Sequence, residues 1–371
     1  MSESPTVSSP NRVEQLRALF AELRLRYPKP LASGASAAPP IADANLYEPG
    51  QLVQIFDPSI VTRVAEGGLD ADEERKSGRR RQIARQLQVS GHQRLLGACV
   101  TDALTERIAV LKASHPNFAE VSEEIAREAV LAQFGNASVT GLRLLLVGPP
   151  GVGKTDYALR LAEALGVPMQ LVSMSTAQAS AHLGGSDEYW SNTRPGAVFE
   201  AITSGRHANP IIVLDEIEKC RLSHVGSGGD PLGALYQLLE PRSAQIFCDR
   251  SVLWLPIDAR HVNWVATANS TEGLDPALLS RFVVFEIPMP SAEAHHAVLQ
   301  RIYTQMLREF GVQDRLAEAL RPQDLDALSG TSIREARLLI RRSIAAALQS
   351  ERDVIEVCHT ARAPERRIGF C

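Results

Sequence analysis

The middle of the chain alternates short apolar runs with amphipathic stretches. After position 154, apolar residues recur every three or four positions, at Tyr157, Leu161 and Leu165, as in a helix that buries one face. Strands separated by helices of this kind favour a parallel sheet with crossover helices. We therefore predict an α/β domain with a five-stranded parallel sheet sandwiched by helices. Its candidate strands are residues 142–147, 169–172, 211–214, 262–266 and 282–287.

The segments on either side of this domain have a different texture. The first 50 residues are rich in Ser, Pro and Ala, which is typical of disordered chain and linkers, apart from one short helical pattern at 12–27. Helical periodicity returns after the last strand, with Gly311 and Gly330 as breaks. The predicted divisions are 1–50 (disordered segment, short helix and linker), 51–115 (N-terminal helical region, mainly α), 116–290 (α/β domain), 291–350 (second helical region) and 351–371 (C-terminal tail).

A glycine-rich loop follows the first candidate strand and precedes the amphipathic stretch. Gly-Pro-Pro-Gly-Val-Gly-Lys-Thr at 148–155 matches G-x-x-x-x-G-K-[ST] in the strand–loop–helix context that a phosphate-binding loop requires. The glycines let backbone N–H groups turn toward phosphate oxygens, and the helix N-terminus adds positive dipole character. Lys154 brings a positive charge to the β- and γ-phosphates, and the Thr155 hydroxyl can ligate Mg²⁺. The predicted nucleotide-binding residues are Gly148, Pro149, Pro150, Gly151, Val152, Gly153, Lys154, Thr155 and Asp156.

Two adjacent carboxylates, Asp215 and Glu216, end the third candidate strand. Two acids at the end of an apolar strand cannot both be buried cheaply without a cation or hydrogen-bond donors nearby. We predict that Asp215 holds Mg²⁺ through its water shell, together with Thr155, and that Glu216 polarises the attacking water as a general base.

With these two motifs, three segments further along the chain make it resemble an AAA+ ATPase. Residues 265–269 are similar to the sensor-1 strand, which implies that Asn269 orients the water near the γ-phosphate. Residues 274–282 resemble the segment that carries the arginine finger, which implies that Arg281 reaches into the next subunit's site and neutralises transition-state charge. Residues 332–334 resemble sensor 2, which implies that Arg334 contacts the γ-phosphate. In an AAA+ ATPase the helical region that carries this residue, here 291–350, forms a lid. The resemblance thus implies ATP hydrolysis with ATP and Mg²⁺ as cofactors, a ring of identical subunits for which six is the family's habit, and the catalytic residues Lys154, Glu216, Asn269, Arg281 and Arg334.

Among AAA+ proteins, residues 118–350 are most similar to the ATPase module of Lon. In Lon a serine–lysine protease domain follows the helical lid. Here only five of the 39 basic residues are lysines, and none follows Lys219. We therefore expect a Lon-like ATPase without the protease domain. The motifs that carry this likeness are the phosphate loop, Leu-Asp-Glu-Ile-Glu-Lys at 214–219, Gly-Asp-Pro at 229–231, Leu-Leu-Glu-Pro at 238–241 and Ala-Thr-Ala-Asn-Ser at 266–270.

Tyr189 and Trp190 are adjacent aromatic residues in a polar, glycine-rich stretch at 184–196. In Lon the equivalent stretch carries a pore aromatic six residues before its final glycine, a position that corresponds to Trp190. A ring of such side chains can grip an extended polypeptide by apolar contact, without sequence preference. The alternative is that the pair packs internally or at a subunit interface.

A β-hairpin from 245–248 and 252–256 is predicted as well, either facing the same channel or lying on the surface.

Composition excludes several classes of protein. A formal net charge of −4, with 44% apolar and 22% charged residues, is normal for a globular chain and unlike a general polyanion binder. The five cysteines include no C-x-x-C pair, which argues against a disulfide framework and a structural zinc site. No apolar signal core and no run of about 18 apolar residues is present, so we expect a cytoplasmic protein without a membrane span.

The leading hypothesis is a ring motor that remodels or unfolds protein substrates without proteolysis. The first alternative is a nucleic-acid motor or loader, because a basic cluster precedes the α/β domain. Glu73 and Glu74 beside that cluster favour a solvated helix face instead, so nucleic acid is not the expected partner. The second alternative is an ATP-gated assembly switch or adaptor whose N-terminal helices bind one partner. The cluster consists of Arg75, Lys76, Arg79, Arg80, Arg81 and Arg85.

Overall fold

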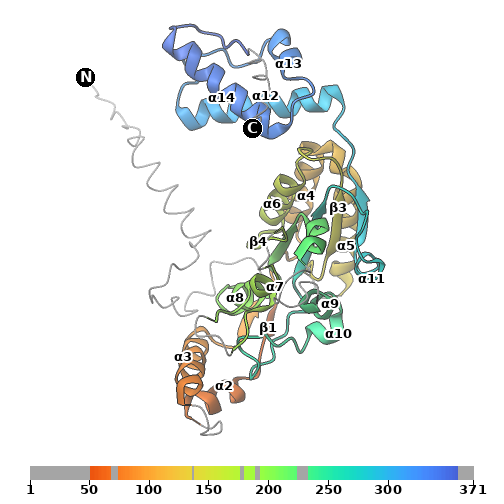
Figure 1. Ribbon diagram of the computed structural model, residues 1–371. Helices are drawn as coiled ribbons and strands as arrows, with labels where there is room; N and C mark the ends of the chain where they lie inside the picture. The colour runs from red at the N-terminus through yellow and green to blue at the C-terminus, as the bar shows by residue number, and fades with distance from the viewer. Residues whose placement is uncertain are drawn as a thin grey trace, which may run out of the picture. The chain divides into compact units, whose positions relative to one another are not determined.

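The computed structural model describes residues 51–67, 74–135, 138–175, 179–188, 193–223 and 233–357 (Figure 1). The chain divides into two compact units, Met1–Ala44 and Asn45–Cys371, and every described residue belongs to the second unit. The predicted helix at 12–27 and the aromatic pair Tyr189 and Trp190 lie outside the described residues.

The α/β domain contains a sheet of five parallel strands in the order β4-β5-β6-β3-β7 (Figure 1). All five are predicted strands, with ends displaced by no more than two residues, so the predicted fold class is confirmed. Parallel neighbours require crossover connections, which helices supply here. The strands are β3 (Arg143–Val147), β4 (Met169–Ser173), β5 (Ile211–Asp215), β6 (Asn263–Ala268) and β7 (Val283–Glu286).

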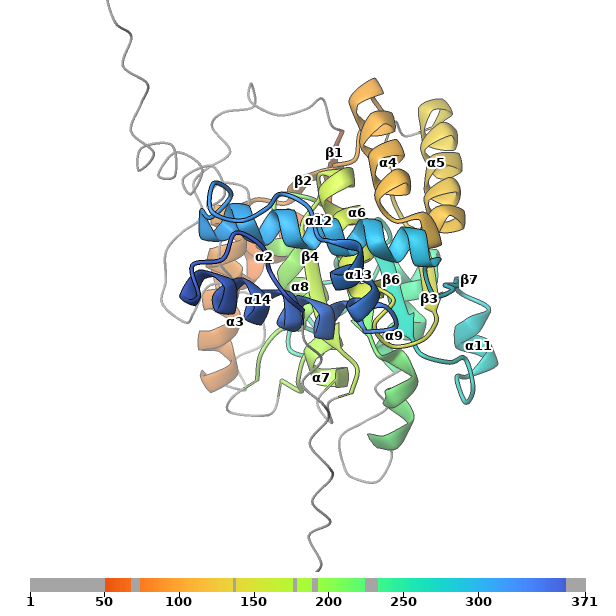
Figure 2. The same ribbon diagram turned by 90° about the horizontal axis from the view of Figure 1, so that it is seen from above.

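Two apolar cores lie on opposite faces of this sheet, because successive side chains of a strand point to opposite faces. In β3, Leu144 and Leu146 pack into one core and Leu145 into the other. Burial on both faces explains why these strands are continuous apolar runs. The helices α4 and α5, which lie side by side, complete the first core together with α6 (Figure 2). The helices of the first core are α4 (Asp102–Ser114), α5 (Ala119–Phe134) and α6 (Lys154–Leu165), and those of the second are α2 (Pro58–Ala65), α3 (Glu74–Ser90), α7 (Ala179–Gly184), α8 (Ala197–Thr203) and α9 (Gly233–Leu239).

The N-terminal region is mostly helical but contains two short strands. β1 (Leu52–Gln54) and β2 (Gln93–Leu95) form an antiparallel pair outside the main sheet. The prediction of helix throughout 51–115 is therefore wrong at these two places. Leu95 donates its N–H to the carbonyl of Arg206 (3.0 Å) and accepts from the N–H of Ala208 (2.8 Å). Hydrogen bonds to a segment so distant in sequence leave no trace in local periodicity.

Arg94 in β2 is a buried cation that is held by carbonyl groups. It donates to Ser90 (3.1 Å) and Gly91 (3.1 Å) at the end of α3, and to Ile202 (3.0 Å) and Thr203 at the end of α8. Burial lowers the pKa of Arg94 to about 10. The last carbonyls of a helix lack intrahelical partners and carry partial negative charge, so one guanidinium stabilises the ends of two helices.

Two buried amides fasten the amino-terminal edge of the sheet. Asn263 accepts a hydrogen bond from the N–H of Leu142 (3.1 Å) and donates to the carbonyl of Asn209 (2.9 Å). Asn209 in turn bonds both backbone groups of Gly97 (2.8 and 3.0 Å) and the carbonyl of Val139 (3.0 Å). Buried polar groups are expected to be paired in this way, and here the pairing joins the chain before β3 to β6.

The connection from β5 to β6 runs from residue 216 to 262, and the hairpin predicted from 245–248 and 252–256 is reduced to one bridge. Within 241–262, all of which is described, a single antiparallel bridge joins Phe247 to Ile257. The buried carboxylate of Asp249 instead accepts from the N–H groups of Ser251 (2.9 Å) and Gly196 (2.8 Å), which bends the chain where a hairpin would continue. The short elements of this region are η3 (Ile217–Ser223), α10 (Pro241–Ala244) and α11 (Pro276–Leu279).

Three helices form the lid and enclose a core of their own. They end where predicted: Gly311 (φ +66°) closes the first, and Gly330 (φ +76°) precedes the last. Both adopt the left-handed conformation that glycine reaches most easily. No helix among those described is long and apolar enough to cross a membrane. The lid helices are α12 (Ala292–Phe310), α13 (Pro322–Leu328) and α14 (Ile333–Gln349).

Asp324, buried in the first turn of α13, ties the lid to the chain that follows it. Its carboxylate accepts from Arg321 (2.7 and 3.3 Å) and from the N–H of Val357 (3.0 Å), while Arg321 also donates to the carbonyl of Ile355 (2.7 Å). Burial acts to raise the pKa of Asp324, but these hydrogen bonds and the Arg321 charge outweigh it, and the pKa is lowered.

We expect Asp324→Asn to lower the free energy of unfolding of the lid by about 1–3 kcal/mol at pH 7. The pKa of Asp324 is lower in the folded state, so its contribution is present above the unfolded-state pKa and is lost as the pH falls through the folded-state value. The melting temperatures of the variant and the wild type should therefore differ at pH 7. The difference should begin to shrink near pH 4, the unfolded-state pKa, and vanish below the lower folded-state pKa. Asp326→Asn, at an exposed position on the same helix, is the control. Equal melting of Asp324→Asn and wild type at pH 7 would contradict this assignment.

Candidate active site

The glycine-rich loop lies between β3 and α6, and its backbone requires glycine. The N–H of Gly148 bonds the last carbonyl of β6 (3.1 Å), and a Cβ atom at this position would come within 2.4 Å of the Ile287 carbonyl oxygen. Gly151 (φ +85°) and Gly153 (φ +96°) adopt the left-handed conformation. The loop is therefore held close to two neighbouring strands, with its N–H groups at the start of α6.

Lys154, the first residue of α6, folds back onto this loop. Its Nζ donates to the carbonyls of Gly148 (2.6 Å) and Pro149 (3.0 Å) and to Oδ1 of Asn269 (3.1 Å), and the residue is only 8% exposed. Burial lowers the pKa of Lys154, although the nearby carboxylates of Glu218, Asp215 and Glu216 act in the opposite direction. A desolvated lysine among acids is a group that gains from a closer anion.

Thr155 and Asp215 lie together, as the sequence predicts. The Thr155 hydroxyl donates to Oδ1 of Asp215 (3.1 Å), and the Thr267 hydroxyl donates to the same oxygen (2.7 Å). Thr267 comes from β6, which contains most of the predicted sensor-1 strand, but sequence analysis gave this threonine no role. Among the described residues, no group of three or more His, Cys, Asp or Glu gathers that could bind a metal alone. Thr155 and Asp215 offer the hard oxygen donors that Mg²⁺ prefers.

Glu216 has an unusual backbone and an occupied carboxylate. Its φ is +59°, a left-handed conformation that costs a non-glycine residue energy and is enriched at functional sites. Its N–H donates to the Thr267 hydroxyl oxygen (3.1 Å), which helps to hold that conformation. Its Oε2 lies 2.6 Å from Nζ of Lys219, and this hydrogen bond raises the pKa of the lysine. The candidate base is thus ion-paired in this conformation.

Glu218 is a site residue whose role sequence analysis missed. Its Oε1 accepts from the backbone N–H (3.2 Å) and the side-chain Nδ2 (2.9 Å) of Asn269. Because Asn269 donates through Nδ2, its Oδ1 is left to accept from Lys154. The other carboxylate oxygen of Glu218 is buried and has no hydrogen-bond partner among the described atoms. The available signal was the third acid in Asp-Glu-Ile-Glu, two residues beyond the candidate base.

The turn between α4 and α5, which includes η2 (Pro116–Phe118), covers the loop from one side. Asn117 donates to the carbonyl of Val152 (3.4 Å), and His115 Nε2 lies 3.3 Å from a carboxylate oxygen of Asp156. The hydrogen bond from His115 is the largest cause of the lowered pKa of Asp156, which the Arg160 and Arg337 charges lower further. The Asp156 carboxylate therefore contacts the covering turn, and nucleotide binding by this residue stays a prediction.

Arg281 lies far from the phosphate loop of its own subunit. It precedes β7, whose Val283 pairs with Leu144 of β3, whereas the loop follows the opposite end of β3. Val283 lies level with Leu144, four residues before the loop, which is about 13 Å along the strand at 3.3 Å per residue. The guanidinium of Arg281 lies 5.4 Å from the ring centroid of Tyr236, and Arg281 also donates to the carbonyl of Ala277. These contacts hold Arg281 near the amino end of β7, whereas the loop follows the carboxyl end of β3.

The lid approaches the loop through the start of α14. A Cβ atom on Gly151 would lie 2.8 Å from Cβ of Ser332, so the two backbones pass closely. Arg334 is exposed in the first turn of α14, two residues beyond Ser332. Arg337, one turn later, is the lid arginine whose charge acts on Asp156.

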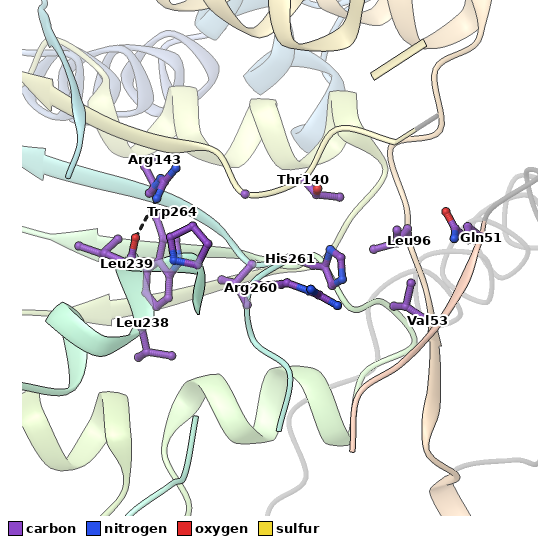
Figure 3. A pocket seen from close by; sticks show the side chains of 13 residues that line it. Gln51, Val53, Leu96, Thr140, Arg143, Leu238, Leu239, Arg260, His261 and Trp264 are labelled. Atoms are coloured by element: carbon purple, nitrogen blue, oxygen red, sulfur yellow. Dashed lines mark hydrogen bonds between the residues drawn. The ribbon is translucent and has the colours of Figure 1, made fainter. Parts of the chain in front are cut away.

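A separate cavity lies at the other edge of the sheet. It measures about 500 Å³ and is lined at the amino ends of β3 and β6, where Arg143, Arg260, His261 and Trp264 surround it (Figure 3). Arg143 already donates to the carbonyl of Leu239 (2.8 Å), and Arg260 pairs with Asp258 (2.9 Å). The cavity is therefore separate from the phosphate loop, which follows the carboxyl end of β3.

Comparison with known proteins agrees with the resemblance seen in the sequence. Residues 144–289 match the AAA family, described as the ATPase family associated with various cellular activities. A peroxisomal Lon protease homolog 2 of Caenorhabditis briggsae is 33% identical over 178 residues, which are 48% of this chain and 22% of that protein. The Lon proteases of Clostridium beijerinckii and Syntrophus aciditrophicus are each 32% identical, over 57% and 58% of this chain and 26% of each protein.

The chain thus spans about a quarter of the length of the curated relatives it matches. Over that part it carries an AAA domain related to the ATPase module of Lon, and the predicted likeness is confirmed.

We expect Glu218→Ala to slow ATP turnover by about 100-fold, the cost of misplacing a catalytic group by about 1 Å, because Asn269 loses the acceptor that orients its amide. Nucleotide affinity should change little, since Lys154 and the loop are intact. Glu272→Ala, an exposed acid three residues after Asn269, is the control. Steady-state turnover and binding of a fluorescent nucleotide separate the two effects, and equal turnover in both variants would contradict the role of Glu218.

Proposed function

We propose that this protein is an ATP-hydrolysing ring motor that remodels or unfolds protein substrates. The observation that carries the proposal is a pair of hydrogen-bonded groups at the carboxyl edge of the sheet, which meet at the neighbouring residues Lys154 and Thr155. Lys154 donates to Asn269 after β6, and Thr155 donates to Asp215 at the end of β5, which also accepts from Thr267 of β6. Ligands of open α/β sheets bind at this edge, which supports a nucleotide there.

The loop and Lys154 bind the phosphates of ATP. Lys154 exchanges its two carbonyl partners for β- and γ-phosphate oxygens, a favourable exchange because charge-assisted hydrogen bonds are stronger than neutral ones. Thr155 and Asp215 hold Mg²⁺, which, when bound with the nucleotide, neutralises charge on the phosphate oxygens. Asp156 keeps its contact with His115 and supports the loop from outside.

Hydrolysis uses Glu216 as the base and Asn269 to orient the water. The water oxygen bonds to the γ-phosphorus, the bond to the β–γ bridging oxygen breaks, and Glu216 accepts the proton. Because Glu216 is paired with Lys219 in this conformation, its carboxylate must first leave Lys219. Arg334 is proposed to contact the γ-phosphate when the lid closes.

A ring is proposed because Arg281 is held away from the phosphate loop of its own subunit. An arginine at the opposite edge of the sheet can complete the site of a neighbouring copy, where it neutralises transition-state charge. Six subunits, the family's habit, is the proposed number.

We expect Arg281→Ala to reduce ATP turnover by about 1,000-fold, within the range of an arginine finger, and Lys154→Ala to abolish it. When both variants are co-expressed with different tags and purified through both, activity should partly return. An intact loop in one subunit then meets an intact Arg281 in the next. Arg242→Ala, an exposed arginine on α10, should leave turnover unchanged. Mixed rings as inactive as either variant would refute action in trans.

The proposed clients are unfolded or destabilised proteins, gripped by Tyr189 and Trp190 in the channel. The relatives are named as Lon proteases, which supports a polypeptide as the client. The proposed activity of the AAA domain itself is remodelling without peptide hydrolysis.

We expect Trp190→Ala to keep ATP turnover near the wild-type rate and to lose unfolding of a fluorescently labelled, destabilised globular protein. The reason is that the grip is lost and the nucleotide site is untouched. Trp254→Phe, outside this segment, should keep both activities. Wild-type unfolding by Trp190→Ala would exclude the gripping role.

A further inference from the structure

Helix α3 binds both residues that bracket the aromatic segment. Arg80 forms a forked ion pair with Glu188, from Nε to Oε1 (2.5 Å) and from the second nitrogen to Oε2 (2.9 Å). Arg79, the preceding residue, donates to the carbonyl of Thr193. The four residues between Glu188 and Thr193 include Tyr189 and Trp190 and lie outside the described part of the chain.

The two bracketing residues belong to a closely bonded frame. Ser186 and Arg194 are bonded through both their backbones (3.1 Å) and the Ser186 hydroxyl (2.8 Å), so the chain leaves and returns at one place. Asp187 pairs with Arg250 through both carboxylate oxygens (3.2 and 2.8 Å). Two consecutive acids are therefore bound by arginines from different parts of the chain. Asp187 is bound by Arg250 of the α/β domain, and Glu188 is bound by Arg80 of the N-terminal region.

The Arg80–Glu188 ion pair is partly buried, so it can contribute to the stability of this contact. The Glu188 side chain is 10% exposed and that of Arg80 31% exposed. Burial also lowers the pKa of the neighbouring Arg79, which the Glu188 charge partly counteracts. Exposed ion pairs contribute little, whereas a partly buried fork with two parallel hydrogen bonds is stronger and fixes direction.

We propose that α3 is a positioning element for Glu188 and Thr193, the two residues that flank the aromatic segment, with Arg80 as the positioning residue. Part of the basic cluster of the N-terminal region thereby serves an internal purpose. A force or a partner that shifts α3 would shift Glu188 and Thr193. The link from this segment to substrate gripping rests on the proposed function, whereas the link from α3 to its flanks does not.

The test compares Arg80→Ala with Arg85→Ala in the full-length chain. Arg85 is exposed on the same helix, so the control removes the same charge without the Glu188 contact. The first readout is hydrogen exchange in peptides that cover 183–188 and 193–199. We expect about tenfold faster exchange in Arg80→Ala only, which corresponds to about 1.4 kcal/mol of lost protection. The charge-swapped double variant Arg80→Glu with Glu188→Arg should restore part of it.

The second readout is unfolding of the labelled protein together with ATP turnover. We expect Arg80→Ala to unfold it more slowly at an unchanged rate of ATP hydrolysis. Equal exchange in Arg80→Ala and Arg85→Ala overturns the positioning role. Faster exchange with unchanged unfolding supports the positioning role and contradicts the gripping function, so the two failures are distinguishable. Loss of binding to single-stranded DNA in both variants, with unchanged exchange, would favour the nucleic-acid reading of the cluster and overturn this one.

Discussion

The structure depends on a group of charges that must neutralise one another at one edge of a buried sheet. Lys154 is almost fully buried, and three acids lie around it. Burial disfavours the charged form of Lys154, and the nearby carboxylates act against that effect. Parallel strands bring their carboxyl ends to one edge, so the chain can assemble these charges from the ends of β3 and β5. The left-handed backbone of Glu216 and the two hydrogen bonds from Asn269 to Glu218 both belong to this arrangement.

Elsewhere in the molecule, arginine side chains join separate segments of the chain through hydrogen bonds and ion pairs. Arg94 closes two helix ends by bonding carbonyls, while Arg80, Arg250 and Arg321 each grip a carboxylate with two hydrogen bonds. A planar guanidinium suits both tasks because its five donors are fixed in direction. The arginine-rich composition therefore has a structural use that the net charge does not show. It connects the N-terminal region to the chain on both sides of the predicted aromatic segment.

The strands and the phosphate loop could be predicted because local pattern suffices for them. A continuously apolar run such as 211–214 is typical of a strand in a sheet that is covered on both faces. Gly151 and Gly153 indicate a backbone conformation that other residues rarely adopt. The two short strands at 52–54 and 93–95 could not be predicted, since they pair with each other across α2 and α3, and Leu95 also bonds to a segment more than a hundred residues away. The hairpin prediction failed for a related reason, because the buried Asp249 carboxylate takes over the turn.

The sequence by itself determined the sheet, the glycine-rich loop, and the carboxylates at the end of β5. Only the tertiary structure decided which groups touch. It brought Glu218 to Asn269, the side chain of Asp156 to His115, and part of the basic cluster to Glu188. It also placed Arg281 near the amino end of β7, away from the loop that follows β3. Periodicity records which side of an element is apolar, whereas the pairing of buried charges depends on distances between segments far apart in the chain.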